Sequence, residues 1–193
     1  MFKELFDEKK AAEVAAFFLV KNRSSLGVLK LMKLMYLAER RSFEQYGEGI
    51  IGDRLVSMDK GPVLSLTYSH MCGDTASIEG GWDSLIADRA DHKIDLRNRN
   101  AVQTTDQLLQ LSDADCAVLE SVWAEFGRMH GNELAEYTHR NCPEWQDPDG
   151  SMIPMKPEDL FKALKFSAEQ SDACLARLKQ QAAISAALSG QRR

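Results

Sequence analysis

The sequence predicts a mainly α-helical fold: a single helical domain around a central buried helix, with a small β-hairpin or short antiparallel sheet and a C-terminal helical extension. Three observations support this prediction. Several long segments repeat apolar residues at helical spacing. The segment 26–45 is apolar around most of its circumference, which is typical of a helix buried on most sides. Glycines and a Gly-Pro pair divide residues 47–81 into short pieces, which is typical of turns and short strands.

The size of the chain allows one well-filled core with an appendage, because it has 193 residues. We expect the main domain to cover residues 1–166 and the helical extension to cover residues 167–193. Apolar residues make up 44% of the chain and charged residues 27%, which is ordinary for a soluble globular protein. The formal net charge of −5 disfavours a dedicated nucleic-acid binder, which normally carries a basic face.

The sequence shows no sign of a membrane or an export signal. No apolar run approaches the roughly 20 residues needed to cross a bilayer. The first ten residues, MFKELFDEKK, lack the order of a signal peptide. We therefore expect a cytoplasmic protein with no membrane partner. Its four widely spaced cysteines are then expected to be reduced thiols. They are Cys72, Cys116, Cys142 and Cys174.

The first helix is predicted over residues 7–21, with Asp7 as its N-cap and apolar residues following at helical spacing. The second helix, residues 26–45, is the most informative element. Ser25 is a suitable cap for its start, and Gly47 lies where glycine commonly ends a helix. Because so little of its surface is polar, we expect this helix to lie at the centre of the molecule.

Five charged residues of the second helix fall within roughly a third of its circumference at 100° per residue. They are Lys30, Lys33, Arg40, Arg41 and Glu44, with Leu37 in the middle of the stripe. One interpretation is a face in contact with solvent. The other is a partner-binding surface, in which the basic residues frame an apolar anchor. The candidate partner-binding residues are Lys30, Lys33, Leu37, Arg40 and Arg41.

Turn-forming residues follow the second helix. The segments LVSM (55–58) and VLSLTY (63–68) are predicted to be short extended or helical pieces, and Gly61-Pro62 is predicted to force the turn between them. Residues 83–100 show no clean helical period. They fit a modest β-hairpin or an irregular excursion.

The second half of the chain returns to helical patterns. Ser112 is a good N-cap for a helix that ends at Gly127, and Asn132 is predicted to cap a short helix after it. A proline-containing loop covers residues 141–157, and Pro157 suits the first turn of the next helix. The helices predicted after this loop cover residues 158–166 and 168–188.

No residue pattern indicates catalysis. His70 and Cys72 lie two positions apart, and His139 and Cys142 lie three apart, but neither pair has a recognisable flanking signature. The histidines and cysteines lack the spacings of zinc sites, and the glycines lack the order of phosphate-binding loops. We therefore expect no catalytic residue, no metal and no cofactor.

Carboxylates close to turns are the remaining candidates for general acid–base chemistry. They are Asp53, Asp59 and Asp74. An aspartate in a glycine-rich turn usually accepts hydrogen bonds from its own backbone, and we favour that role for Asp53 over catalysis.

Two blocks of the sequence resemble the Panacea-domain family, which includes the SocA-like antitoxins. Residues 29–73 carry the family's hallmark: a helix of the form L-x-K-L-x-Y-x-A-[DE]-R, then Y-G, I-x-G-D, a short strand and G-P-[VP]. Residues 131–145, GNELAEYTHRNCPEW, resemble its second block, in which a helix ending in Thr-His leads to Pro-x-Trp. The similarity covers roughly residues 10–165.

The resemblance implies a bacterial or phage antitoxin, encoded beside a cognate toxin and neutralising it by direct binding. It leaves two alternatives: a proteolytic adaptor that delivers the toxin to the ClpXP protease, and a DNA-binding regulator of its own operon. The resemblance also identifies a turn motif in this sequence. The residues of this motif are Gly52, Asp53, Arg54, Gly61 and Pro62. We expect them to pin the loop and strand against the central helix, with Asp53 and Arg54 pairing internally or reaching that helix.

Overall fold

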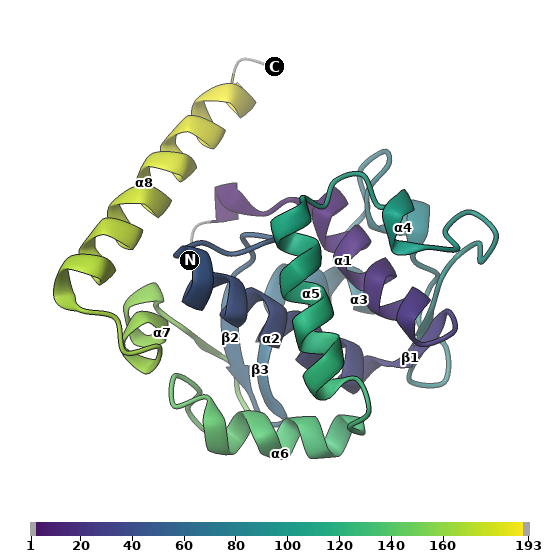
Figure 1. Ribbon diagram of the computed structural model, residues 1–193, viewed down its shortest axis with the longest axis horizontal. Coiled ribbons are helices and arrows are strands. Elements are labelled where there is room, and N and C mark those ends of the chain that lie inside the picture. Colours follow the sequence, from purple (N-terminus) through teal and green to yellow (C-terminus); the bar gives the residue numbers. More distant parts are fainter. Residues whose placement is uncertain (1–2, 191–193) are drawn as a thin grey trace.

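A long helix runs through the middle of the protein. The structure is a computed structural model that describes residues 3–190 (Figure 1). Helix α2 (Val28–Tyr46) contacts α1 (Glu8–Lys21), α5 (Asp113–Phe126) and α6 (Gly131–Asn141), and strand β3 (Gly61–Leu64) also packs on it. The mainly helical fold around a central buried helix is therefore confirmed.

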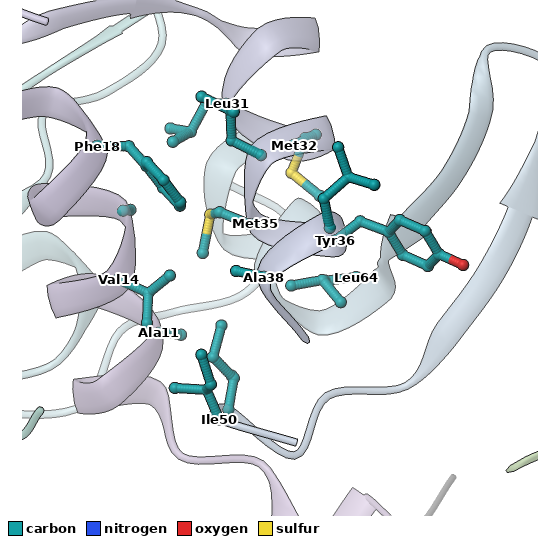
Figure 2. Close-up of a cluster of buried hydrophobic side chains, with 14 of the residues drawn as sticks. Ala11, Val14, Phe18, Leu31, Met32, Met35, Tyr36, Ala38, Ile50 and Leu64 are labelled. Atoms are coloured by element: carbon teal, nitrogen blue, oxygen red, sulfur yellow. The ribbon is translucent and has the colours of Figure 1, made fainter. Parts of the chain in front are cut away.

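The core lies between α1 and α2. Figure 2 shows Val14 and Phe18 of α1 facing Met35 of α2, with Ile50 and Leu64 closing the cluster from other segments. Each of these side chains is at most 5% exposed. Burial of large apolar side chains is the main source of stability in such a core. The core therefore fixes α2 on the side that faces α1.

The ends of the first two helices follow local rules with one exception. Asp7 caps α1 by accepting a hydrogen bond from the backbone N–H of Lys10, and Gly47 ends α2 in the left-handed conformation, at φ 70°. Both predictions are confirmed. The predicted cap Ser25 is wrong, because Gly27 is the N-cap of α2. Ser25 instead begins strand β1 (Ser25–Gly27).

A hairpin lies against α2. Strands β2 (Leu55–Met58) and β3 are antiparallel, and Met58 pairs with Gly61. Asp59 and Lys60 therefore form the two-residue turn, and the prediction that Gly61-Pro62 forms it is wrong. Gly61 instead opens β3 at φ 97°, a backbone conformation closed to most residues.

A third strand extends this sheet, and a helix follows it. Strand β5 (Ile153–Pro154) pairs with β2 on the side opposite β3. The segment VLSLTY divides in two: its first residues end β3, and the rest begin helix α3 (Ser65–Cys72).

Residues 82–96 combine a short helix with scattered β pairing. Helix α4 (Trp82–Leu85) leads to strand β4 (Lys93–Asp95), and isolated bridges join Ile86 to Leu96 and Ala90 to Lys93. Ala90 and Lys93 exchange backbone hydrogen bonds across a turn at Asp91-His92, so the modest β-hairpin alternative predicted for this region is the closer one. Strand β4 also pairs with β1 from a distant part of the sequence.

The remaining helices begin close to where their capping residues predict. Ser112 caps α5, as predicted, and Pro157 lies in the first turn of α7 (Pro157–Ala163). The predicted cap Asn132 is wrong by two residues, because His130 precedes α6. Short 3₁₀ turns complete the described elements; they are η1 (Lys3–Leu5) and η2 (Thr105–Gln107).

The last helix, α8 (Ala168–Gly190), extends along one side of the molecule (Figure 1). Arg177 forms an ion pair of 2.7 Å with Glu48, and the Ser185 hydroxyl donates to the carbonyl of Glu4 at 2.6 Å. These contacts tie α8 to the C-terminal end of α2 and to η1. Within residues 3–190, no helix is both long enough and apolar enough to span a bilayer.

Glu39 is a fully buried acid of α2 that holds the loop after this helix. Its carboxylate accepts hydrogen bonds of 2.9 Å from the backbone N–H groups of Ile50, Ile51 and Gly52. Burial raises the pKa of Glu39 to about 7, although these bonds favour the charged form. The side chain thus satisfies three backbone donors that lie against the core.

We expect Glu39→Gln to lower the free energy of unfolding by about 1–3 kcal/mol at pH 8, because an amide cannot accept from all three donors. Between pH 4.5 and pH 7, Glu39 holds a proton in the folded wild-type chain and has lost it in the unfolded chain. The stability advantage of wild type should therefore increase as the pH falls from 7 towards 4.5, by about 2 kcal/mol. Urea denaturation of both proteins at pH 8 and pH 5 measures this; an unchanged difference would contradict the raised pKa.

Candidate functional site

The charged stripe predicted on α2 is largely covered by other segments, although Glu44 at its end is exposed. Lys33 is 0% exposed and Leu37 is 6% exposed, so the expectation that this stripe is free is wrong for both residues. Helices α5 and α6 pack on this face of α2. The sequence pattern could not show this covering, since α5 and α6 lie far along the chain.

Each basic residue of the stripe has a partner inside the molecule. Lys30 donates to the carbonyl of Gly127 at 2.6 Å and lies over the ring of Trp123. Lys33 donates to the carbonyl of Pro62 at 2.6 Å. Arg41 pairs with Glu125 on α5. These contacts connect α2 to the end of α5 and to the hairpin.

Arg40 belongs to a buried network around Glu144. The Arg40 Nε donates to Glu144 Oε1 at 2.7 Å, and the Tyr36 hydroxyl donates to the same oxygen at 2.5 Å. Glu144 is 3% exposed. An acid so deeply buried needs a cation and hydrogen-bond donors, and α2 supplies both. The segment after α6 is thereby fixed to the central helix.

The turn motif also makes contacts that stabilise the fold. Asp53 is fully buried and accepts hydrogen bonds from the backbone N–H groups of Arg54, Leu66 and Thr67, and from the Thr67 hydroxyl. Three of these four donors lie in the first turn of α3, so Asp53 holds the start of that helix. Burial raises the pKa of Asp53, and the hydrogen bonds from Thr67 oppose this.

The glycines of the motif lie where a side chain would collide. At Gly52, which has φ 72°, a Cβ atom would lie 2.4 Å from the carbonyl oxygen of Leu5. At Gly61 it would lie 2.6 Å from the Thr138 hydroxyl and 3.1 Å from Nζ of Lys33. Close approach of the hairpin to α2 and α6 therefore requires glycine at position 61.

A groove of about 850 Å³ opens beside this packed region. It is lined by the first turns of α2 and α6, by the tip of the β2–β3 hairpin, and by the segment that contains Arg89 and His92. Its cationic lining residues are Lys30, Lys33, Lys60 and Arg89, and its one acidic lining residue is Asp59. Cavities of this volume commonly hold a small ligand or a few side chains of a partner. The groove brings together two residues of the predicted partner-binding set, Lys30 and Lys33.

The histidine and cysteine pairs do not form a nucleophilic centre. The His70 ring stacks between Phe6 and Trp82, and its Nε2 lies 3.6 Å from the carboxylate of Glu8. The Cys72 thiol instead accepts from Arg89 at 3.7 Å.

The second pair, His139 and Cys142, is also unsuited to thiol chemistry. The His139 ring stacks on Trp145 at 4.0 Å. Burial raises the pKa of the Cys142 thiol to about 12, which opposes the thiolate that nucleophilic chemistry needs. In the part of the chain that the structure describes, no group of three His, Cys, Asp or Glu side chains could hold a metal ion.

Sequence reasoning missed the two buried acids, Glu39 and Glu144. Glu39 could have been noticed, because it lies off the charged stripe, among the apolar residues of its helix. Glu144 offers no such signal. Its role depends on Tyr36 and Arg40, which are more than a hundred positions away.

A comparison with protein-family models matches residues 31–146 to the family described as antitoxin SocA-like, Panacea domain. The matched segment includes most of α2, the hairpin, α5, α6 and the buried network around Glu144. Searches of curated proteins and of solved structures returned no match.

We expect the free energy of unfolding of Lys33→Met to increase less with pH than that of the wild-type protein. Burial lowers the pKa of Lys33 to about 7, well below its usual value. Between pH 7 and pH 10.5 the unfolded chain therefore binds a proton that the folded chain lacks, and stability rises with pH. Relative to the methionine variant, wild type should gain roughly 3 kcal/mol between pH 7 and pH 9.5. Urea denaturation at both pH values tests this; parallel changes in the two proteins would contradict it.

Proposed function

The chain belongs to the SocA-like Panacea-domain antitoxin family, and from this premise we propose that it neutralises a cognate toxin by direct protein–protein binding. The observation that carries the proposal is the extent of the family match, which covers more than half of the chain, including most of α2 and the helices α5 and α6 that pack on it. The partner is a toxin encoded beside this chain, and the complex forms in the cytoplasm.

The chemistry of the site supports a binding role rather than catalysis. The buried polar side chains of α2 are engaged in holding other segments, as shown by Glu39 and Lys33. The Cys142 thiol is held in its protonated form by burial. The groove beside Lys30 instead offers a concave surface with charged edges, which suits recognition of another polypeptide.

Action as a proteolytic adaptor is the second candidate, because the end of α8 presents apolar side chains to solvent. Ile184 is 54% exposed and Leu188 is 58% exposed, and they lie one turn apart. An adaptor needs a surface for the protease in addition to the one for the toxin. A DNA-binding role has less support, since the net charge is −5 and Arg40 and Arg41 are engaged with acids.

Co-expression with the adjacent small protein tests the antitoxin proposal. The wild-type chain should restore growth of cells that produce this protein, and the two should co-elute from a size-exclusion column as a stable complex. The control is the same gene with an early stop codon, which should give no protection. A neighbour that is equally harmful in both cases would refute the proposal.

Deletion of residues 189–193 separates inhibition from delivery. If the chain is an adaptor that uses this tail, the deletion should leave toxin binding unchanged and lengthen the half-life of the toxin in cells. The measurement is a chase of toxin levels after protein synthesis is stopped. The matched comparison is the full-length chain in cells without ClpXP. An unchanged half-life would reject the tail as the protease-docking segment.

A further inference from the structure

The cations that line the groove lack acidic partners. The structure pairs basic residues with acids at several other places, but within residues 3–190 none of the four groove cations forms an ion pair. Lys30 and Lys33 donate to backbone carbonyls, and Arg89 donates to the Cys72 thiol. Lys60 is exposed at the turn of the hairpin.

The acids around the groove leave most of this charge uncompensated. The carboxylate of Asp59 lines the groove, but it accepts the backbone N–H of Gly150. Burial lowers the pKa of Lys30, and the negative charge of Glu133, in the first turn of α6, opposes this effect. The carboxylate of Glu133 also accepts a hydrogen bond from the backbone N–H of His130. Each of these two carboxylates therefore accepts a hydrogen bond from a backbone N–H group and forms no ion pair with a groove cation. The lining therefore has an excess of positive charge.

Lys33 lies beneath the floor of the groove, and burial lowers its pKa to about 7, so an anion brought close to it favours its charged form. It is 0% exposed, and its ammonium contacts a neutral carbonyl rather than a carboxylate. A buried cation with no counter-ion is costly, and an anion brought near it in a region of low dielectric reduces that cost.

The groove also has an apolar part. Val28, Leu29, Met58 and Tyr68 line it, and each is only partly buried. Half-exposed apolar side chains next to unpaired cations suit a peptide that carries both acidic and apolar residues. A nucleic acid would need a longer basic track than these four cations provide.

We propose that this groove binds an acidic segment of the toxin, with its carboxylates facing Lys60 and Arg89 and an apolar side chain lying on Leu29 and Met58. This inference rests on the proposed antitoxin function and adds the chemistry of the partner. Lys33 stabilises the bound carboxylates from below the floor, without direct contact.

The test is charge reversal at the two exposed groove cations, Lys60→Glu with Arg89→Glu. The matched control, Lys9→Glu with Lys179→Glu, makes the same change in net charge at exposed positions outside the groove. The probe is the small protein encoded beside this chain, and its affinity is measured by calorimetry at 50 mM and 300 mM salt. Thermal unfolding of each variant shows that the fold is retained.

We expect the groove variant to bind about ten- to a hundredfold more weakly at low salt, because like charges then face each other, and the control to bind as wild type does. Equal binding by both variants, or an equal loss in both, would overturn the inference and leave the antitoxin proposal standing. Loss of binding to a single-stranded RNA oligomer, with toxin binding unchanged, would assign the groove to nucleic acid instead. Failure of the wild-type chain to bind the probe would refute both proposals.

Discussion

Hydrogen bonds between buried polar side chains of α2 and the segments wrapped around it hold this fold together. Glu39 accepts from the loop that follows the helix, Lys33 donates to the hairpin, and Tyr36 with Arg40 fixes Glu144 after α6. Apolar burial fixes α2 against α1, but such contacts are not directional. Buried polar groups must find partners with defined geometry, so they select one arrangement of the surrounding segments.

This arrangement explains what the family match reports. Three polar residues of the family's helical hallmark, Lys33, Tyr36 and Glu39, are buried, and all three hold other segments of the scaffold. The match therefore identifies a way of folding, and the residues that meet a partner must be sought on the surface that this scaffold presents. Lys60 is not one of the residues that the hallmark pattern specifies, and Arg89 lies beyond the hallmark segment; both line the groove.

Several local features of the structure could be predicted from the sequence, whereas features that depend on distant segments could not. The caps Asp7 and Ser112 were predictable because a capping side chain bonds a donor only three residues away. The pairing of β1 with β4 joins segments nearly seventy positions apart and left no local pattern. Leu37 shows the same limit for the site. Its position among charged residues predicted a surface anchor, but helices α5 and α6 pack on α2 and Leu37 is only 6% exposed.

The attachment of α8 has a geometric consequence. The groove lies at the N-terminal end of α2, whereas Arg177 ties α8 to Glu48 just beyond its C-terminal end. A helix of 19 residues separates its two ends by about 28 Å. A molecule bound in the groove would therefore lie about one helix length away from the point where α8 is attached.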